Sequence, residues 1–131
     1  MRLMQSTLHA QPFDSKAVRE LSLQCRDWLT AELARPADGR WDKTVVVTHF
    51  APSLRSADVR YGCQPSTASF CNADDALLPQ ADLWLHGHLH CRHDYLVPRT
   101  GRAPMRVVCQ ARGLADKGEV DGCDDLELIE I

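Results

Sequence analysis

The sequence predicts an α/β fold, and three observations support this prediction. A helical pattern of apolar residues in the first third of the chain leads into a run of valines at 45–47. A second apolar stretch, at 82–86, has the length of a buried strand. Two further β-rich segments follow, separated by a short turn-like stretch. A helix that leads into apolar strands is typical of α/β proteins.

Length and composition restrict the class of protein. The chain has 131 residues, of which 44% are hydrophobic, so we expect one domain over residues 1–131. Fifteen Lys and Arg against 18 Asp and Glu give a net charge of −3, which favours neither nucleic acid nor an anionic membrane as a partner. The sequence shows neither a signal-peptide core nor a bilayer-length apolar run, so we expect a cytoplasmic protein.

The helix is predicted between Asp14, a suitable N-cap, and the Pro- and Gly-containing stretch 35–40. Residues 1–12 show no periodic pattern, and we expect a tail or an entering loop there. Apolar residues at helical spacing form one stripe on this helix. They are Val18, Leu21, Cys25, Trp28, Leu29 and Leu33.

The first predicted strand is the valine run. Three consecutive β-branched residues indicate a strand that is buried on both faces. The stretch 51–72 is rich in Pro, Ser and Gly and is expected to be a long loop, followed by a short helix at 73–78. The strand at 82–86 is expected to stop at Gly87.

The last third of the sequence predicts more β structure. Residues 93–97 and 104–110 read as two strands, joined through the turn-like stretch 98–103 into a hairpin. Alternating apolar residues at 126–131 predict a C-terminal strand.

Six cysteines are scattered along the chain, and none forms a Cys-x-x-Cys pair. Without an export signal they are expected to be reduced thiols, most of them buried, rather than disulfides or a structural zinc site. They are Cys25, Cys63, Cys71, Cys91, Cys109 and Cys123.

Three histidines are concentrated at the end of the second strand, in the stretch HGHLH at 86–90. On an extended chain His88 and His90 share a face, so both can reach one metal. We expect His86 to hydrogen-bond a ligand or a substrate oxygen, and His93 to face solvent. The alternative is that these are ordinary surface histidines at a strand end.

His49 directly follows the valine strand, at the edge where α/β sheets place their ligands. If the two apolar strands run parallel in one sheet, His49 meets His88 and His90, and we predict that all three bind metal. Thr48 is expected to orient this segment through its hydroxyl. The alternative is that His49 packs in a loop.

Three motifs, taken in order, resemble the C-terminal half of the calcineurin-like metallophosphoesterase family. They are VVVTHFAPS with its Thr-His-x-x-Pro element, DLWLHGHLH with Gly-His-x-His, and RVVCQARG. The resemblance covers residues 26–131. It implies part of a four-layer α/β/β/α sandwich from which the N-terminal strands are missing.

The resemblance also implies an activity and its cofactors. The family hydrolyses phosphoesters with two divalent metal ions, Mn, Fe or Zn, which hold a bridging hydroxide for attack on phosphorus. His49 and His88 would bind one metal and His90 the other. Arg112 would contact the phosphoester substrate.

The chain departs from the family in two respects. The motifs Asp-x-His, Gly-Asp-x-x-Asp and Gly-Asn-His, which supply the remaining ligands, do not occur, and Gln110, Ala111 and Leu114 replace family residues. Because three neutral imidazoles cannot offset the repulsion between two cations, we expect at most one tightly bound metal and poor turnover. We also expect self-association or a partner that covers the missing half.

Two other interpretations remain open at this stage. In the first, the chain is a catalytically incomplete remnant or subunit, which binds metal or a partner without turnover. In the second, it is a small zinc module that uses His88, His90 and Cys91. The zinc module is disfavoured because Cys91 would point away from His90 on an extended chain.

Overall fold

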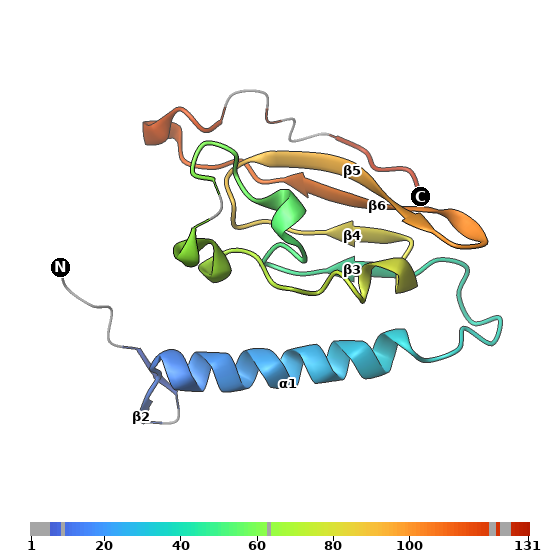
Figure 1. Cartoon of the computed structure of the whole chain (residues 1–131), viewed down its shortest axis with the longest axis horizontal. Coiled ribbons are helices and arrows are strands. Elements are labelled where there is room, and N and C mark those ends of the chain that lie inside the picture. The colour runs from blue at the N-terminus through green and yellow to red at the C-terminus, as the bar shows by residue number, and fades with distance from the viewer. Residues whose placement is uncertain (1–5, 9, 63, 121–122, 124–126) are drawn as a thin grey trace. The chain divides into compact units, whose positions relative to one another are not determined.

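A computed structural model describes residues 6–8, 10–62, 64–120, 123 and 127–131 of the chain (Figure 1). The chain divides into two compact units, Met1–Pro36 and Ala37–Ile131. The prediction of one domain stays a prediction. Within the described residues, no helix is long and apolar enough to cross a membrane.

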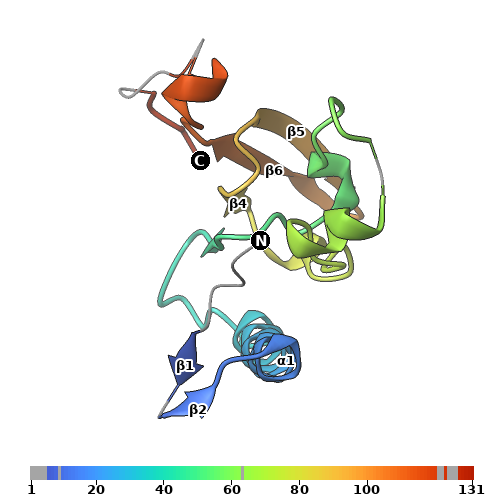
Figure 2. The same ribbon diagram turned by 90° about the vertical axis from the view of Figure 1, so that its left-hand side faces the viewer.

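The first unit contains the predicted helix, α1 (Ser15–Leu33). Asp14 caps it, since its Oδ1 accepts a hydrogen bond of 2.9 Å from the backbone N–H of Ala17. Before the helix, β1 (Thr7–Leu8) and β2 (Gln11–Pro12) form a small antiparallel pair (Figure 2). The sequence predicts a tail or an entering loop for residues 1–12, and this strand pair corrects that prediction for the described residues before the helix.

The second unit is built on a four-stranded mixed sheet, which confirms the α/β class. Its strands are β3 (Val45–Val47), β4 (Leu83–Leu85), β5 (Arg92–Arg99) and β6 (Arg102–Gln110). The order is β3-β4-β6-β5, with β3 and β6 parallel to β4 and with β5 antiparallel to β6 (Figure 1). The predicted hairpin is confirmed, and Gly101 adopts φ +68° in its turn.

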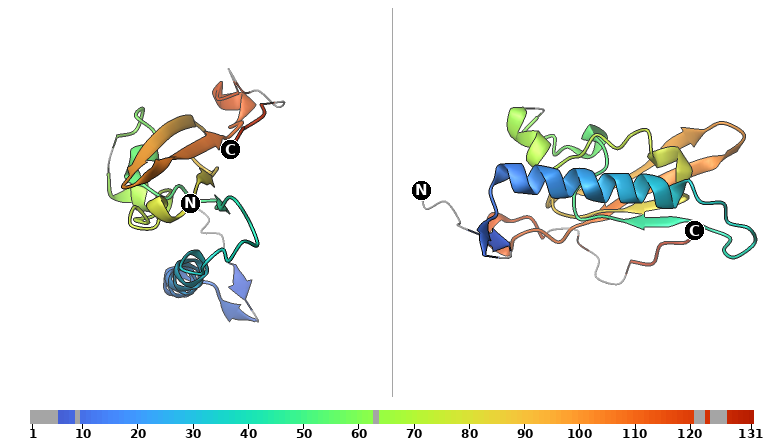
Figure 3. Two further views of the ribbon diagram at one scale, coloured as in Figure 1. Left: turned by 90° about the vertical axis from the view of Figure 1, so that its right-hand side faces the viewer. Right: turned by 90° about the horizontal axis from the view of Figure 1, so that it is seen from below.

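The core includes both faces of the central strands β4 and β6, since neighbouring residues such as Leu83 and Trp84, which point to opposite faces, are both buried. Val46, Trp84 and Val107 are adjacent across β3, β4 and β6, and all three are buried. Short 3-10 turns gather on one side of the sheet (Figures 2 and 3). These turns are η1 (Leu54–Ser56), η2 (Pro65–Ser69) and η3 (Leu78–Gln80), and a fourth, η4 (Ala115–Lys117), follows β6.

Three further sequence predictions were wrong. Val45 and Val47 are 42% and 72% exposed, because β3 is an edge of the described sheet and only Val46 points into the core. In place of a helix at 73–78 there is the 3-10 turn η3, which begins later and contains a proline in its first turn. Residues 127–131 form no strand; Leu126 lies outside the described residues.

The cysteines agree with the prediction of reduced thiols where they are described. No disulfide joins the described cysteines, which are Cys25, Cys71, Cys91, Cys109 and Cys123, and Cys63 lies outside the described residues. Their burial is more varied than expected: Cys71 and Cys109 are buried, whereas Cys25 is exposed.

Candidate functional site

Two adjacent parallel strands bring the histidine segments to one edge of the sheet. Val47 of β3 pairs with Leu85 of β4, and the chain continues into His49 on one side and residues 86–90 on the other. The backbone N–H of Gly87 donates to the carbonyl of His49 over 3.1 Å. The predicted parallel arrangement is therefore confirmed.

The hydroxyl of Thr48 fixes the segment that carries His49. It donates to the carbonyl of Phe50 over 2.7 Å and accepts from the indole N–H of Trp84 over 2.9 Å. Since Trp84 is fully buried in β4, this hydroxyl anchors the end of β3 to the core. The role predicted for Thr48 agrees with these contacts.

The rings of His49 and His88 lie side by side, with centroids 4.7 Å apart. Phe50 and Phe70 flank His88 at 4.8 and 5.2 Å. Burial, and then the neighbouring His49, lower the pKa of His88, so its neutral form, the metal-binding form, is favoured near neutral pH.

The backbone around His88 and His90 is not extended, contrary to the shared-face argument. His88 and His90 have φ values of +69° and +52°, and the N–H of Leu89 donates to the carbonyl of Gly87 over 2.9 Å, which closes a tight turn on His88. Left-handed conformations at non-glycine residues cost about 1–2 kcal/mol each and cluster at functional sites. Gly87, by contrast, has no positive φ, so the turn does not depend on it.

His90 is held by Glu119, a residue that the sequence analysis missed. Nδ1 of His90 donates to Oε2 of Glu119 over 3.0 Å, and the side chain of Glu119 is 4% exposed. The backbone N–H of Leu114, with added help from His90, lowers the pKa of Glu119 and keeps it ionised. Because Nδ1 is the donor, Nε2 of His90 is left with its lone pair for a ligand.

Gly113 explains how Glu119 reaches this position. Its φ is +75°, and a Cβ built on it would lie 2.5 Å from Cβ of Glu119. Only glycine therefore permits this close approach. The Arg-Gly pair at 112–113 was a signal for such a turn, although no pattern in the sequence indicates which later residue packs against it.

His86 is buried and is hydrogen-bonded to a row of two hydroxyl groups, those of Ser56 and Tyr95. Its Nδ1 lies 3.3 Å from the carbonyl oxygen of Gly87, and its Nε2 lies 3.0 Å from Oγ of Ser56, which is 2.9 Å from the hydroxyl of Tyr95. A carbonyl can only accept, so the neutral ring carries its proton on Nδ1 and accepts from Ser56. Burial lowers the pKa of His86. Its predicted contact with a ligand or substrate stays a prediction.

The solvent-facing interpretation of His93 was wrong. His93 is half-buried on β5, where its Nε2 lies 3.2 Å from Sγ of Cys91, and burial lowers its pKa. Burial also raises the pKa of Cys91 to about 11. The zinc module stays an open alternative. Arg112 is exposed, and its substrate contact stays a prediction.

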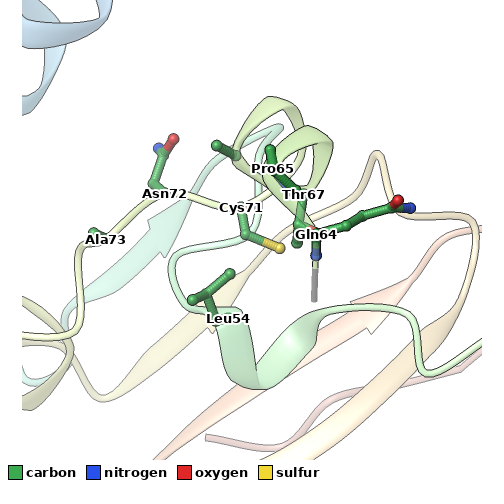
Figure 4. Close-up of a pocket in the computed structure, with 8 residues that line it drawn as sticks. Leu54, Gln64, Pro65, Thr67, Cys71, Asn72 and Ala73 are labelled. Carbon is green, nitrogen blue, oxygen red and sulfur yellow. The ribbon is translucent and has the colours of Figure 1, made fainter. Parts of the chain in front are cut away.

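Two hollows border the loop between β3 and β4. The larger, about 440 Å³, lies where Leu54 of η1 and Cys71 face Pro65 and Thr67 of η2, and none of its described lining residues is a histidine (Figure 4). The smaller, about 290 Å³, includes Phe70 and Leu89 in its wall and therefore adjoins the turn that carries His88 and His90.

In the described part of the chain, no group of three or more His, Cys, Asp or Glu side chains is arranged to hold a metal ion. Of the three predicted metal ligands, His49 and His88 have their rings close together, whereas His90 is hydrogen-bonded to Glu119. Comparisons with protein-family models, curated proteins and solved structures give no match for this chain.

Proposed function

We propose that this chain carries the imidazole half of a calcineurin-like metallophosphoesterase site, in which His49, His88 and His90 bind a divalent cation. The observation that carries the proposal is the convergence of His49 and His88, with ring centroids 4.7 Å apart, at the ends of adjacent parallel strands. The reaction class is hydrolysis of a phosphoester. A bound Mn, Fe or Zn ion supplies hydroxide near neutral pH and offsets charge on the phosphoryl oxygens.

The hydrogen bonds around the histidines support binding of one cation. Metal-binding histidines commonly donate their other ring N–H to a carbonyl or a carboxylate, which fixes the tautomer. His90 is bonded in this way to Glu119. Its other ring nitrogen therefore keeps a lone pair for a cation, and the hydrogen bond already holds the ring in place.

The same donor set does not fit two cations. Two divalent ions a few ångström apart need a bridging carboxylate, and Glu119, the described carboxylate that contacts His90, is already bonded to that ring and to the N–H of Leu114. We therefore propose one metal per chain. A second metal, and the four-layer sandwich that would surround it, require the N-terminal strands of the family, which a partner of different sequence would supply. Self-association would cover the exposed face without adding those ligands. We also propose that the protein is cytoplasmic.

A second candidate is a catalytically incomplete remnant or subunit that binds metal or a partner without turnover. The absence of a three-ligand cluster among the described side chains favours it. Hydrolysis of p-nitrophenyl phosphate, or of its bis ester, with added Mn²⁺ separates the two candidates, since only the first predicts turnover.

Calorimetric titration with Mn²⁺ tests metal binding itself. We expect one site per chain, and we expect His90→Gln to weaken it by about tenfold or more. His93→Gln is the matched control, since His93 is also a histidine of this unit but is bonded to Cys91, and it should leave Mn²⁺ affinity unchanged. Two tight sites per chain would contradict the one-metal proposal, and absence of binding would contradict the function.

A further inference from the structure

The smaller hollow adjoins the candidate metal site through two residues. Leu89, which lines it, lies between His88 and His90 in the chain, and Phe70, which also lines it, has its ring 5.2 Å from that of His88. A molecule whose phosphoryl group meets these histidines therefore has this hollow beside it. We name it the Phe70 pocket; its walls are Asp58, Tyr61, Gly62, Gln64, Ser66, Thr67, Phe70 and Leu89.

The lining of the Phe70 pocket suits an uncharged group with an apolar face. Tyr61, Phe70 and Leu89 offer ring and aliphatic surface, and the neutral side chains of Gln64 and Thr67 offer hydrogen-bonding atoms. None of the described lining residues is basic, so the pocket has no cation of its own with which to hold a phosphate.

The charged member of the lining is already paired. Asp58 is bound by the guanidinium of Arg60, with contacts of 2.6 and 2.9 Å to Oδ2. The hydrogen bond from Arg60 holds the pKa of Asp58 below its usual range, so it is ionised at neutral pH. The two charges offset each other, so this part of the lining offers no net positive charge to a second phosphate or a carboxylate on the ligand.

We propose that the Phe70 pocket holds the alcohol portion of the phosphoester, and that this portion is an uncharged group about the size of one aromatic ring. The inference rests on the proposed function, because the phosphoryl group is placed at the histidines. A volume of about 290 Å³ accommodates a single ring with polar substituents. The rings of Phe70 and Tyr61 favour an aromatic group through offset or edge contacts.

The test compares phenylphosphonate with methylphosphonate as ligands of the Mn²⁺-loaded chain, by calorimetry. Both carry the same anionic head and neither is hydrolysed, so the readout is affinity and not turnover. We expect phenylphosphonate to bind about tenfold more tightly. Tyr61→Ser should remove most of this preference without changing Mn²⁺ affinity; Tyr61 is 62% exposed, so the fold should tolerate the change.

Val59→Ser is the matched control, because Val59 is 91% exposed on the same loop and does not line the pocket. It should retain the preference for phenylphosphonate. Equal affinities for the two ligands, or a preference that survives in Tyr61→Ser, would overturn the inference while Mn²⁺ binding still supports the proposed function.

Phenol, added to the metal-free chain, tests the pocket without the metal. Chemical-shift changes at Phe70 and Leu89 that disappear in Tyr61→Ser would support the pocket even if Mn²⁺ failed to bind and the proposed function fell. No change at these residues with excess phenol would overturn the pocket, whatever the outcome of the metal titration.

Discussion

At the scale of single residues, the orientation of His90 depends on a glycine more than twenty positions away in the sequence. Gly113 adopts φ +75° and lets Glu119 pack directly against it, and Glu119 in turn accepts from Nδ1 of His90 over 3.0 Å. Gly118 has a similar φ of +66° but has no atom within 4 Å of the position that a Cβ would take. A substitution at Gly118 therefore tests backbone strain alone, whereas one at Gly113 tests backbone strain together with the close contact to Glu119.

We predict that Gly113→Ala is much more destabilising than Gly118→Ala. The second change costs about 1–2 kcal/mol for the left-handed backbone alone. The first adds overlap with Glu119, for a total of about 2–4 kcal/mol. Urea denaturation followed by circular dichroism measures both. Equal losses would show that Glu119 does not pack against residue 113.

At the scale of secondary-structure elements, Asp82 connects the starts of the strands that position the site. Its Oδ2 accepts from the backbone N–H of Thr44 over 2.9 Å, and its Oδ1 accepts from Arg99 over 3.1 Å. Thr44 precedes β3, Asp82 precedes β4, and Arg99 ends β5. Because the strands are aligned at one end, their other ends carry His49 and His88 to a common edge.

We predict that Asp82→Asn destabilises the chain by about 1–3 kcal/mol at pH 7. Burial acts to raise the pKa of Asp82, but the hydrogen bonds from Thr44 and Arg99 and the charges of Arg99 and Arg102 outweigh it and lower the pKa below 3.8. A lowered pKa stabilises the fold above pH 3.8, and this contribution is lost as the pH falls through the folded-state pKa. The difference from the unaltered chain should therefore shrink below about pH 4.

Asp94→Asn is the control for this prediction. Asp94 also pairs with an arginine, Arg106, but its side chain is 51% exposed, so its loss should cost less than about 1 kcal/mol. Urea denaturation at several pH values compares the two variants. A larger loss for Asp94→Asn would contradict the role assigned to Asp82.

At the scale of the whole molecule, the sheet has an open edge at β3. Val47 is 72% exposed, and in the described sheet β3 pairs on one side only, with β4. Unpaired strand edges with apolar side chains favour pairing with another chain. This feature agrees with the proposal that a second polypeptide, or a second copy of this chain, completes the sheet.

We predict concentration-dependent association of the isolated chain, measured by sedimentation equilibrium. Val47→Lys should reduce it, because a lysine on an edge strand opposes pairing. Val59→Lys should not, since Val59 is even more exposed but lies outside the strands. A chain that stays monomeric at every concentration would contradict this prediction.

Much of the fold could be predicted from local pattern, whereas much of the site could not. The cap at Asp14, the hairpin and the strand at Leu83–Leu85 depend on residues close together in sequence, and all three are present in the structure. The prediction that both faces of the valine strand are buried was wrong, because the burial of a strand depends on the segments that pack beside it and not on its own residues. Histidines at φ above zero could not be foreseen, since histidine has no local preference strong enough to impose that conformation.

The sequence by itself determined that apolar strands end in histidines, and hence that imidazole gathers where the strands stop. Only the tertiary structure decided that His49 and His88 meet, that His90 turns to Glu119, and that His93 packs beside Cys91. The physical reason is that periodicity fixes which way a side chain points from its own element, while its partner is set by contacts between segments far apart in the chain.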